Sequence, residues 1–186
     1  VRAVRTRELT RAAMSDLLGG VDPRGHAIAD ATDAALLGAL AIAGREEAER
    51  WGSVRAHVTF VAMGRYGGRE CSYASDADVI ALHEPVGGAS DSEAAASATA
   101  IVNRVKKLLG SATSQLGIVV DLDLRPEGKN GPMSRTIASH EEYAQRWAST
   151  WERQAAVRAR PIGSSDLDER ARALFESIAY REVSES

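Results

Sequence analysis

The sequence lacks the features of a secreted or membrane-inserted chain. Its single cysteine, Cys71, cannot form an intrachain disulfide, which favours a reducing compartment. No uninterrupted apolar run approaches the ~20 residues of a membrane span, and no signal peptide is visible. We therefore expect a cytoplasmic protein that makes no contact with a membrane.

A large excess of charge is also missing. The net charge is only −3, so we expect no nucleic-acid partner. Apolar residues make up 44% of the chain and charged residues 26%, which is typical of a globular protein. A chain of 186 residues can form one domain with a sizeable core, or a small domain with a helical attachment. Because it begins at Val1 rather than Met and enters helix-type sequence at once, we interpret it as a segment of a longer protein.

The order of helical and strand patterns predicts an α+β fold. Apolar spacing predicts helices over 1–19, 26–50, 91–110, 139–160 and 166–179, with Asp91 and Asp166 as N-caps. β-Branched residues predict strands over 57–63, 77–83 and 117–125. We expect these strands to form a small mixed sheet with flanking helices, preceded by an N-terminal helical lead.

A pair of acidic residues stands at the start of the second predicted strand. Asp76 and Asp78 are two positions apart, so on a strand they point to the same face. Like charges at that spacing repel, and burying unpaired carboxylates is costly. Two solvated aspartates on an edge strand would give the same spacing, but the neighbouring Ala77, Val79 and Ile80 indicate a partly buried strand. We therefore expect a divalent cation here.

The third predicted strand repeats the pattern with Asp121, Asp123 and Arg125. One more carboxylate on a neighbouring strand would complete a site for two Mg²⁺ ions, which prefer oxygen ligands. The spacing does not choose between Asp121 and Asp123, and Arg125 could instead pair with Asp123. Lys129 follows in a glycine-flanked loop, where it could contact phosphate or belong to a surface turn.

The loop between the first two strands has the composition of a phosphate-binding loop. Gly67 and Gly68 allow backbone N–H groups to approach a phosphate closely, and Ser75 adds a hydroxyl donor. A Gly-Gly pair alone is weak evidence, but here it precedes an Asp-x-Asp pair across a strand–loop–strand unit. Cys71 has no neighbouring histidine and is interpreted as a small loop residue.

Aromatic and cationic residues cluster in the last third of the chain. Tyr143, Trp147 and Trp151 recur at i, i+4 and i+8 of a predicted helix, which favours core packing over a platform for a base. The arginines that follow are expected to include one or two functional cations among exposed charges: Arg153, Arg158 and Arg160.

Three longer strings resemble one family. The arrangement of Gly67, Gly68, Ser75, Asp76 and Asp78 resembles the nucleotidyltransferases of the DNA polymerase β superfamily. The strings MGRYGGRECSYASDADV, VVDLDLRPEGKNGP and WASTWERQAAVRARP are similar to motifs of the bacterial glutamine synthetase adenylyltransferase / adenylyl-removing enzyme family, in its actinobacterial form. The resemblance covers about 57–165.

The resemblance implies a polymerase β-like nucleotidyltransferase domain over 53–186, behind a helical lead over 1–52. It implies ATP as a substrate, Mg²⁺ as the cofactor, glutamine synthetase as the protein substrate, and PII-type signalling proteins as regulators of the full-length enzyme. Asp76, Asp78 and Asp121 would be the catalytic metal ligands. The nucleotide would contact Gly67, Gly68, Ser75, Arg125 and Lys129.

Two positions depart from the family pattern. Arg65 stands where the family commonly has lysine, and Asp123 replaces an arginine, which leaves Asp123 without an inherited role. Full-length family members contain two catalytic halves, one adding AMP to a tyrosine of glutamine synthetase and the other removing it by phosphorolysis. The opening VRAVRTRELTRAA looks like the entry to the C-terminal, adenylylating half. Phosphorolysis, or a non-catalytic docking domain of the same fold, are the alternatives.

Overall fold

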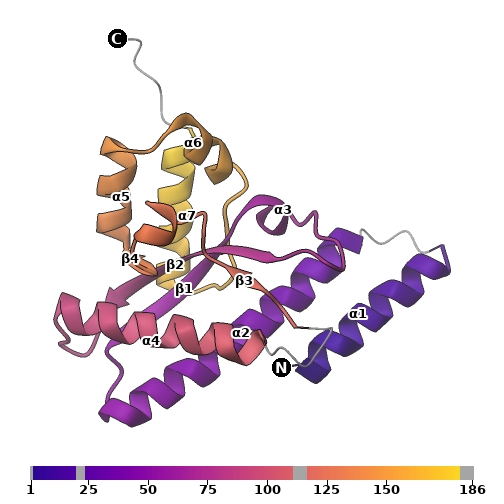
Figure 1. The fold of residues 1–186 in the computed structure, drawn as a ribbon, viewed down its shortest axis with the longest axis horizontal. Helices are drawn as coiled ribbons and strands as arrows, with labels where there is room; N and C mark the ends of the chain where they lie inside the picture. The colour runs from indigo at the N-terminus through magenta and orange to yellow at the C-terminus, as the bar shows by residue number, and fades with distance from the viewer. Residues whose placement is uncertain (1, 20–23, 111–116, 181–186) are drawn as a thin grey trace.

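A small mixed sheet lies at the centre of the structure (Figure 1). The computed structural model describes residues 2–19, 24–110 and 117–180. The strands are β1 (Ala56–Ala62), β2 (Ala77–Pro85), β3 (Val120–Asp121), β4 (Ser134–Thr136) and β5 (Arg160–Pro161). The helices are α1 (Arg2–Leu17), α2 (Arg24–Trp51), α3 (Gly64–Gly67), α4 (Asp91–Leu109), α5 (Ile137–Arg146), α6 (Thr150–Ala156) and α7 (Asp166–Ala179). The α+β class, the small mixed sheet and the flanking helices are confirmed.

The β1–β2 hairpin is the frame of the sheet. The two strands pair antiparallel from Ala56↔Pro85 to Ala62↔Val79. β3 and β4 each pair parallel with β2, and β5 pairs antiparallel with β1. The sequence missed β4 and β5, which are three and two residues long. Strands so short carry too few residues for an alternating pattern to be recognised.

The predicted strand over 117–125 is wrong in length, because β3 has two residues. Its end has a local cause. The Asp121 carboxylate accepts a hydrogen bond from the backbone N–H of Asp123 at 2.7 Å, and the Arg125 N–H donates to the Leu122 carbonyl at 3.1 Å. An aspartate that bonds to the backbone two residues ahead turns the chain out of the extended conformation.

Helices cover both faces of the sheet (Figure 1). Phe60 and Val79 pack on the side of α1, α2 and α4. Their neighbours Val61 and Ile80 pack on the side of α7, as the alternation of side chains along a strand requires. Both faces of the β1–β2 hairpin are therefore buried, and both acidic segments adjoin a rigid frame.

The first two helices share a core with the sheet. Leu9 of α1 and Ile28 and Leu36 of α2 belong to the same apolar cluster as Phe60. Among the described residues, α2 is the one helix with the length and composition of a membrane span, and 44% of that apolar window is buried inside the protein. A core helix meets the same criterion, so membrane association stays a matter of prediction.

The predicted helix over 139–160 is wrong, because the chain forms α5 and α6 with a break between them. Ser149 is the N-cap of α6. The carboxylate of Glu152 accepts hydrogen bonds from the Ser149 N–H and hydroxyl, both at 2.7 Å. Trp147 is 72% exposed and Trp151 is 54% exposed, so the prediction of core packing fails for both. Tyr143 is half-buried and donates to Glu152 Oε1 at 3.0 Å.

Serines, not the predicted aspartates, cap α4 and α7. Ser90 and Ser165 form capping boxes with Glu93 and Asp168. In this motif the serine oxygen accepts a backbone N–H one turn ahead while the acidic side chain bonds back. Asp91 and Asp166 occupy the first turn instead, where a negative charge faces the positive end of the helix dipole.

Gly67 gives a test of the packing around α3. A β-carbon at this position would stand 1.9 Å from the Arg158 carbonyl oxygen and 2.6 Å from that of Ala62. We expect Gly67→Ala to lower the free energy of unfolding by at least ~1–3 kcal/mol, because neither backbone oxygen can rotate away. Urea denaturation measures the change.

The matched control is Gly44→Ala, within α2. A β-carbon there would meet no atom of the described residues within 4 Å. Alanine should raise the free energy of unfolding by ~0.5–1 kcal/mol, since it favours the helix over glycine. A Gly67→Ala protein as stable as the unsubstituted one would contradict this packing.

Candidate active site

The parallel pairing of β2 and β3 brings two carboxylates together. In the register of the two strands, Asp78 lies opposite Asp121. Neighbouring strands are ~4.8 Å apart, and paired residues point to the same face. Asp76 precedes Asp78 by two positions, just before the strand begins, and is exposed. The structure thus brings the predicted carboxylates to one corner of the sheet.

The electrostatics of Asp78 reflect this clustering. Burial raises the pKa of its carboxyl group, and the negative charges of Asp121 and Asp76 raise it further. The cation of Arg65 acts in the opposite direction. Gly64 follows β1 with φ +53°, and a β-carbon on it would stand 3.3 Å from Asp78 Oδ2. The Asp78 carboxylate therefore lies against the start of α3.

Asp123 lies outside this cluster. Its carboxylate pairs with Lys129 Nζ at 3.2 Å and with Arg125 Nη1 at 3.7 Å. Asp121 instead adds to the charge that Asp78 experiences. The structure therefore separates two residues that the spacing alone left equivalent.

The chemistry of this corner fits a hard divalent cation. Carboxylate oxygens are the ligands that Mg²⁺ prefers, and a cation would offset the repulsion between Asp78 and Asp121. Within the described ranges, no group of three or more His, Cys, Asp or Glu side chains converges closely enough to hold a metal ion. The paired Asp78 and Asp121 fit as ligands, and with Asp76 they do not form a closed set of three ligands among the described residues.

The predicted phosphate-binding residues lie beside the carboxylates in sequence but are already engaged. The N–H groups of Gly67 and Gly68 donate to the carbonyls of Met63 and Gly64 at 2.8 and 3.1 Å. Ser75 Oγ accepts the Ser72 N–H at 2.9 Å. Gly67 is buried, and a β-carbon on it would meet two backbone oxygens, so its role in the described structure is steric. Its contact with phosphate stays a prediction.

The two predicted cations differ in their surroundings. Arg125 is almost fully buried and donates to the carbonyls of Leu122 at 2.8 Å and Gly131 at 3.2 Å, so it fastens the loop that follows β3. Lys129 is exposed and pairs with Asp123. Of the two, Lys129 has the freedom to reach a ligand.

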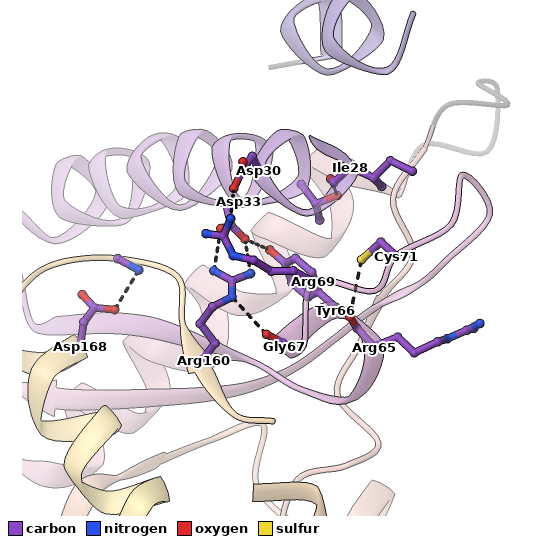
Figure 2. A network of polar contacts seen from close by, with 12 residues as sticks. Ile28, Asp30, Asp33, Arg65, Tyr66, Gly67, Arg69, Cys71, Arg160 and Asp168 are labelled. Carbon is purple, nitrogen blue, oxygen red and sulfur yellow. Dashed lines mark hydrogen bonds and ion pairs between the residues drawn. The ribbon is translucent and has the colours of Figure 1, made fainter. Parts of the chain in front are cut away.

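Sequence reasoning missed the polar network behind α3. Asp33 of α2, Tyr66 of α3 and Arg160 of β5 meet there (Figure 2). Arg160 was one of three arginines in which functional cations were expected. One aspartate among the polar residues of a long helix gives no signal in the sequence, and the contact becomes visible only once the three elements are placed.

Additional contacts hold the loop after α3 to the helical lead and the C-terminal segment. Arg69, with φ +57°, pairs with Asp30 at 2.8 Å, and Tyr73 donates to Asp16 at 3.0 Å. Glu70 pairs with Arg158 at 2.7 Å. The loop that leads to Asp76 is thus fastened at several points.

Comparison with known proteins shows the family. The family model for glutamate-ammonia ligase adenylyltransferase matches residues 1–175. Three relatives are named bifunctional glutamine synthetase adenylyltransferase/adenylyl-removing enzyme. That of Streptomyces coelicolor is 38% identical over 98% of this chain, and that of Bifidobacterium longum 44% over 90%. That of Mycobacterium tuberculosis is 37% identical over 96%.

The match to each of these relatives is partial on their side. The chain covers 20% of the Streptomyces protein, 16% of the Bifidobacterium protein and 18% of the Mycobacterium protein. Both the family model and the relatives nevertheless cover most of this chain. The chain therefore belongs to the glutamate-ammonia ligase adenylyltransferase family, a family of nucleotidyltransferases.

Proposed function

We propose that this chain catalyses the Mg²⁺-dependent transfer of AMP from ATP to a tyrosine hydroxyl of glutamine synthetase, on a polymerase β-like nucleotidyltransferase fold. The observation that carries the proposal is the register pair of Asp78 and Asp121, with Asp76 two residues away. The names of the relatives supply the protein substrate, and adenylylation implies ATP as the donor.

The three carboxylates would have different roles in the transfer. Asp76 and Asp78 would hold the Mg²⁺ that contacts the phosphates, and Asp121 would share a second ion. When bound, the metal ions supply charge neutralisation at the attacking and leaving oxygens. Asp121 accepts the proton of the tyrosine hydroxyl as its oxygen attacks the α-phosphorus. The bond from the α-phosphorus to the bridging oxygen breaks, and pyrophosphate leaves with the electron pair.

Cations and donors around the carboxylates would orient the triphosphate. Gly67, Gly68 and Ser75 are proposed to line the phosphates, with Lys129 and Arg125 as further contacts. The exposed Arg65 joins them, because its positive charge already acts on Asp78. Positioning and charge neutralisation supply most of the acceleration in phosphoryl-type transfers.

The direction of the reaction is a separate proposal. The relatives carry both activities in their names. We assign this chain to the adenylylating, C-terminal half because of the opening VRAVRTRELTRAA. The second candidate is phosphorolysis of adenylylated glutamine synthetase, which gives ADP on the same site. PII-type proteins are proposed as regulators and the cytoplasm as the location.

Removal of one charge from the carboxylate pair tests the metal site. Asp78→Asn keeps the side-chain volume, and we expect it to lower the rate of AMP transfer by on the order of 100-fold or more. Asp123→Asn is the matched control, since Asp123 pairs with Lys129 and lies outside the cluster. It should keep the rate within about threefold. Equal losses in the two variants would contradict the assignment.

The same substitution should not weaken the fold. Because the pKa of Asp78 is raised in the folded state, its ionised form disfavours folding at neutral pH. This penalty is absent below the ordinary aspartate pKa of ~3.9 and develops as the pH rises through the folded value. Asp78→Asn should therefore unfold at an equal or higher urea concentration at pH 7. A lower midpoint would show that Asp78 supports the fold.

A paired assay separates the two directions. With ATP, Mg²⁺ and unmodified glutamine synthetase, we expect an AMP mass increment on one tyrosine-containing peptide. With phosphate and adenylylated glutamine synthetase, we expect no ADP. ADP without any mass increment would assign the chain to the removing half. The absence of both products would favour a non-catalytic docking domain.

A further inference from the structure

Three segments far apart in the sequence meet behind α3 (Figure 2). Asp33 comes from the middle of α2, Tyr66 from α3, and Arg160 from β5 at the edge of the sheet. In the sheet register, Arg160 lies opposite Ala62, the last residue of β1. The three side chains thus meet next to the turn that leads from β1 into α3.

The contacts among these side chains are short and directional. Arg160 donates from Nη1 to Asp33 Oδ2 at 2.7 Å and from Nη2 to Oδ1 at 3.0 Å, a bidentate pair. The Tyr66 hydroxyl donates to the same Oδ1 at 2.5 Å. Burial, and secondarily the charge of Asp33, raises the pKa of Tyr66, so the hydroxyl keeps its proton.

Arg160 also binds the backbone of α3. Its Nε donates to the Gly67 carbonyl at 3.3 Å, and its guanidinium lies 5.5 Å from the centre of the Tyr66 ring. Gly67 in turn packs against the backbone of Arg158 so closely that no β-carbon fits. One carboxylate on α2 therefore holds α3 through both a side chain and a backbone carbonyl.

Stability alone does not explain this arrangement. Side chains of Asp33 and Arg160 are only 14% and 18% exposed, so both charges lose much of their hydration. Replacing such a buried pair with apolar residues of similar volume is often neutral or stabilising. The polar pair instead fixes the geometry, because the Arg160 guanidinium can make both hydrogen bonds to the Asp33 carboxylate in only one orientation.

The opposite side of α3 faces the carboxylate corner. Gly64 lies against the Asp78 carboxylate, and the cation of Arg65 acts on that group, while the neighbouring Tyr66 points to Asp33. A shift of α3 would therefore move Gly64 and Arg65 relative to Asp78. In active sites, a misplacement of about 1 Å can cost on the order of 100-fold in rate.

We propose that Asp33 is a positioning residue for AMP transfer, which fixes α3 through Tyr66 and Arg160 so that Gly64 and Arg65 stay in place beside Asp78. This inference rests on the proposed function. It gives the helical lead an indirect role in the transfer, because Asp33 acts through its contacts with Tyr66 and Arg160.

The test compares Asp33→Asn with a matched control on the same helix. Glu46 of α2 makes a bidentate pair with Arg104 of α4, at 2.6 and 2.9 Å, and does not belong to the site. Asp33→Asn should lower kcat about 10-fold or more with KM for glutamine synthetase unchanged within about threefold. Glu46→Gln, which breaks a bidentate ion pair that is more exposed, should leave kcat within about twofold.

Hydrogen exchange supplies a second readout that does not need activity. The N–H groups of Gly67, Gly68 and Glu70 donate within and just after α3. Asp33→Asn should speed exchange in a peptide covering 63–71 while exchange in the β1–β2 hairpin stays unchanged. Glu46→Gln should not change exchange in 63–71.

Tyr66→Phe keeps the test decisive if Asp33→Asn fails to fold. It removes one hydroxyl and leaves the bidentate pair of Asp33 and Arg160, so we expect a smaller loss of kcat and the same local change in exchange. A normal kcat in the folded Asp33 or Tyr66 variant, or exchange in 63–71 that matches the unsubstituted protein, overturns the positioning role. If the unsubstituted protein transfers no AMP in either direction, the proposed function fails, and the exchange result still decides whether Asp33 fixes α3.

Discussion

The repulsion between Asp78 and Asp121 is the constraint around which the rest of the structure is arranged. The parallel pairing of β3 with β2 places the two carboxylates opposite each other, although β3 is only two residues long. Burial and the neighbouring charges hold the pKa of Asp78 above its ordinary value. A fold that keeps like charges this close loses free energy unless a cation binds between them, and for this reason we propose a divalent cation at this point.

The surrounding elements connect that corner to α2 and to the segment before β5. The β1–β2 hairpin is packed on both faces, and the apolar cluster on one of them includes residues of α1 and α2. The loop after α3 is fastened to α2 through Asp30 and to the segment before β5 through Arg158. The helical lead therefore belongs to the same core as the sheet and takes part in holding the loop that leads to Asp76.

The sequence predicted what depends on local pattern. Long apolar periodicity placed α2 and α4 and the two main strands within a few residues, and the Asp-x-Asp spacing located the carboxylate corner. It did not predict the break at Ser149, because a capping box can interrupt a helix whose apolar spacing continues. Nor did it choose between Asp121 and Asp123, since the choice depends on where β3 ends and on the charge partners of Asp123. Asp33 had no local signal, because its role depends on contacts 33 and 127 positions away along the chain.

A crystal structure of the protein with Mg²⁺ and a non-hydrolysable ATP analogue tests the central claim most directly. The account predicts metal density between the carboxylates of Asp78 and Asp121, with the triphosphate extending toward Arg65 and with no metal on Asp123. Metal bound to Asp123 instead of Asp121, or a nucleotide bound away from this corner of the sheet, would contradict it.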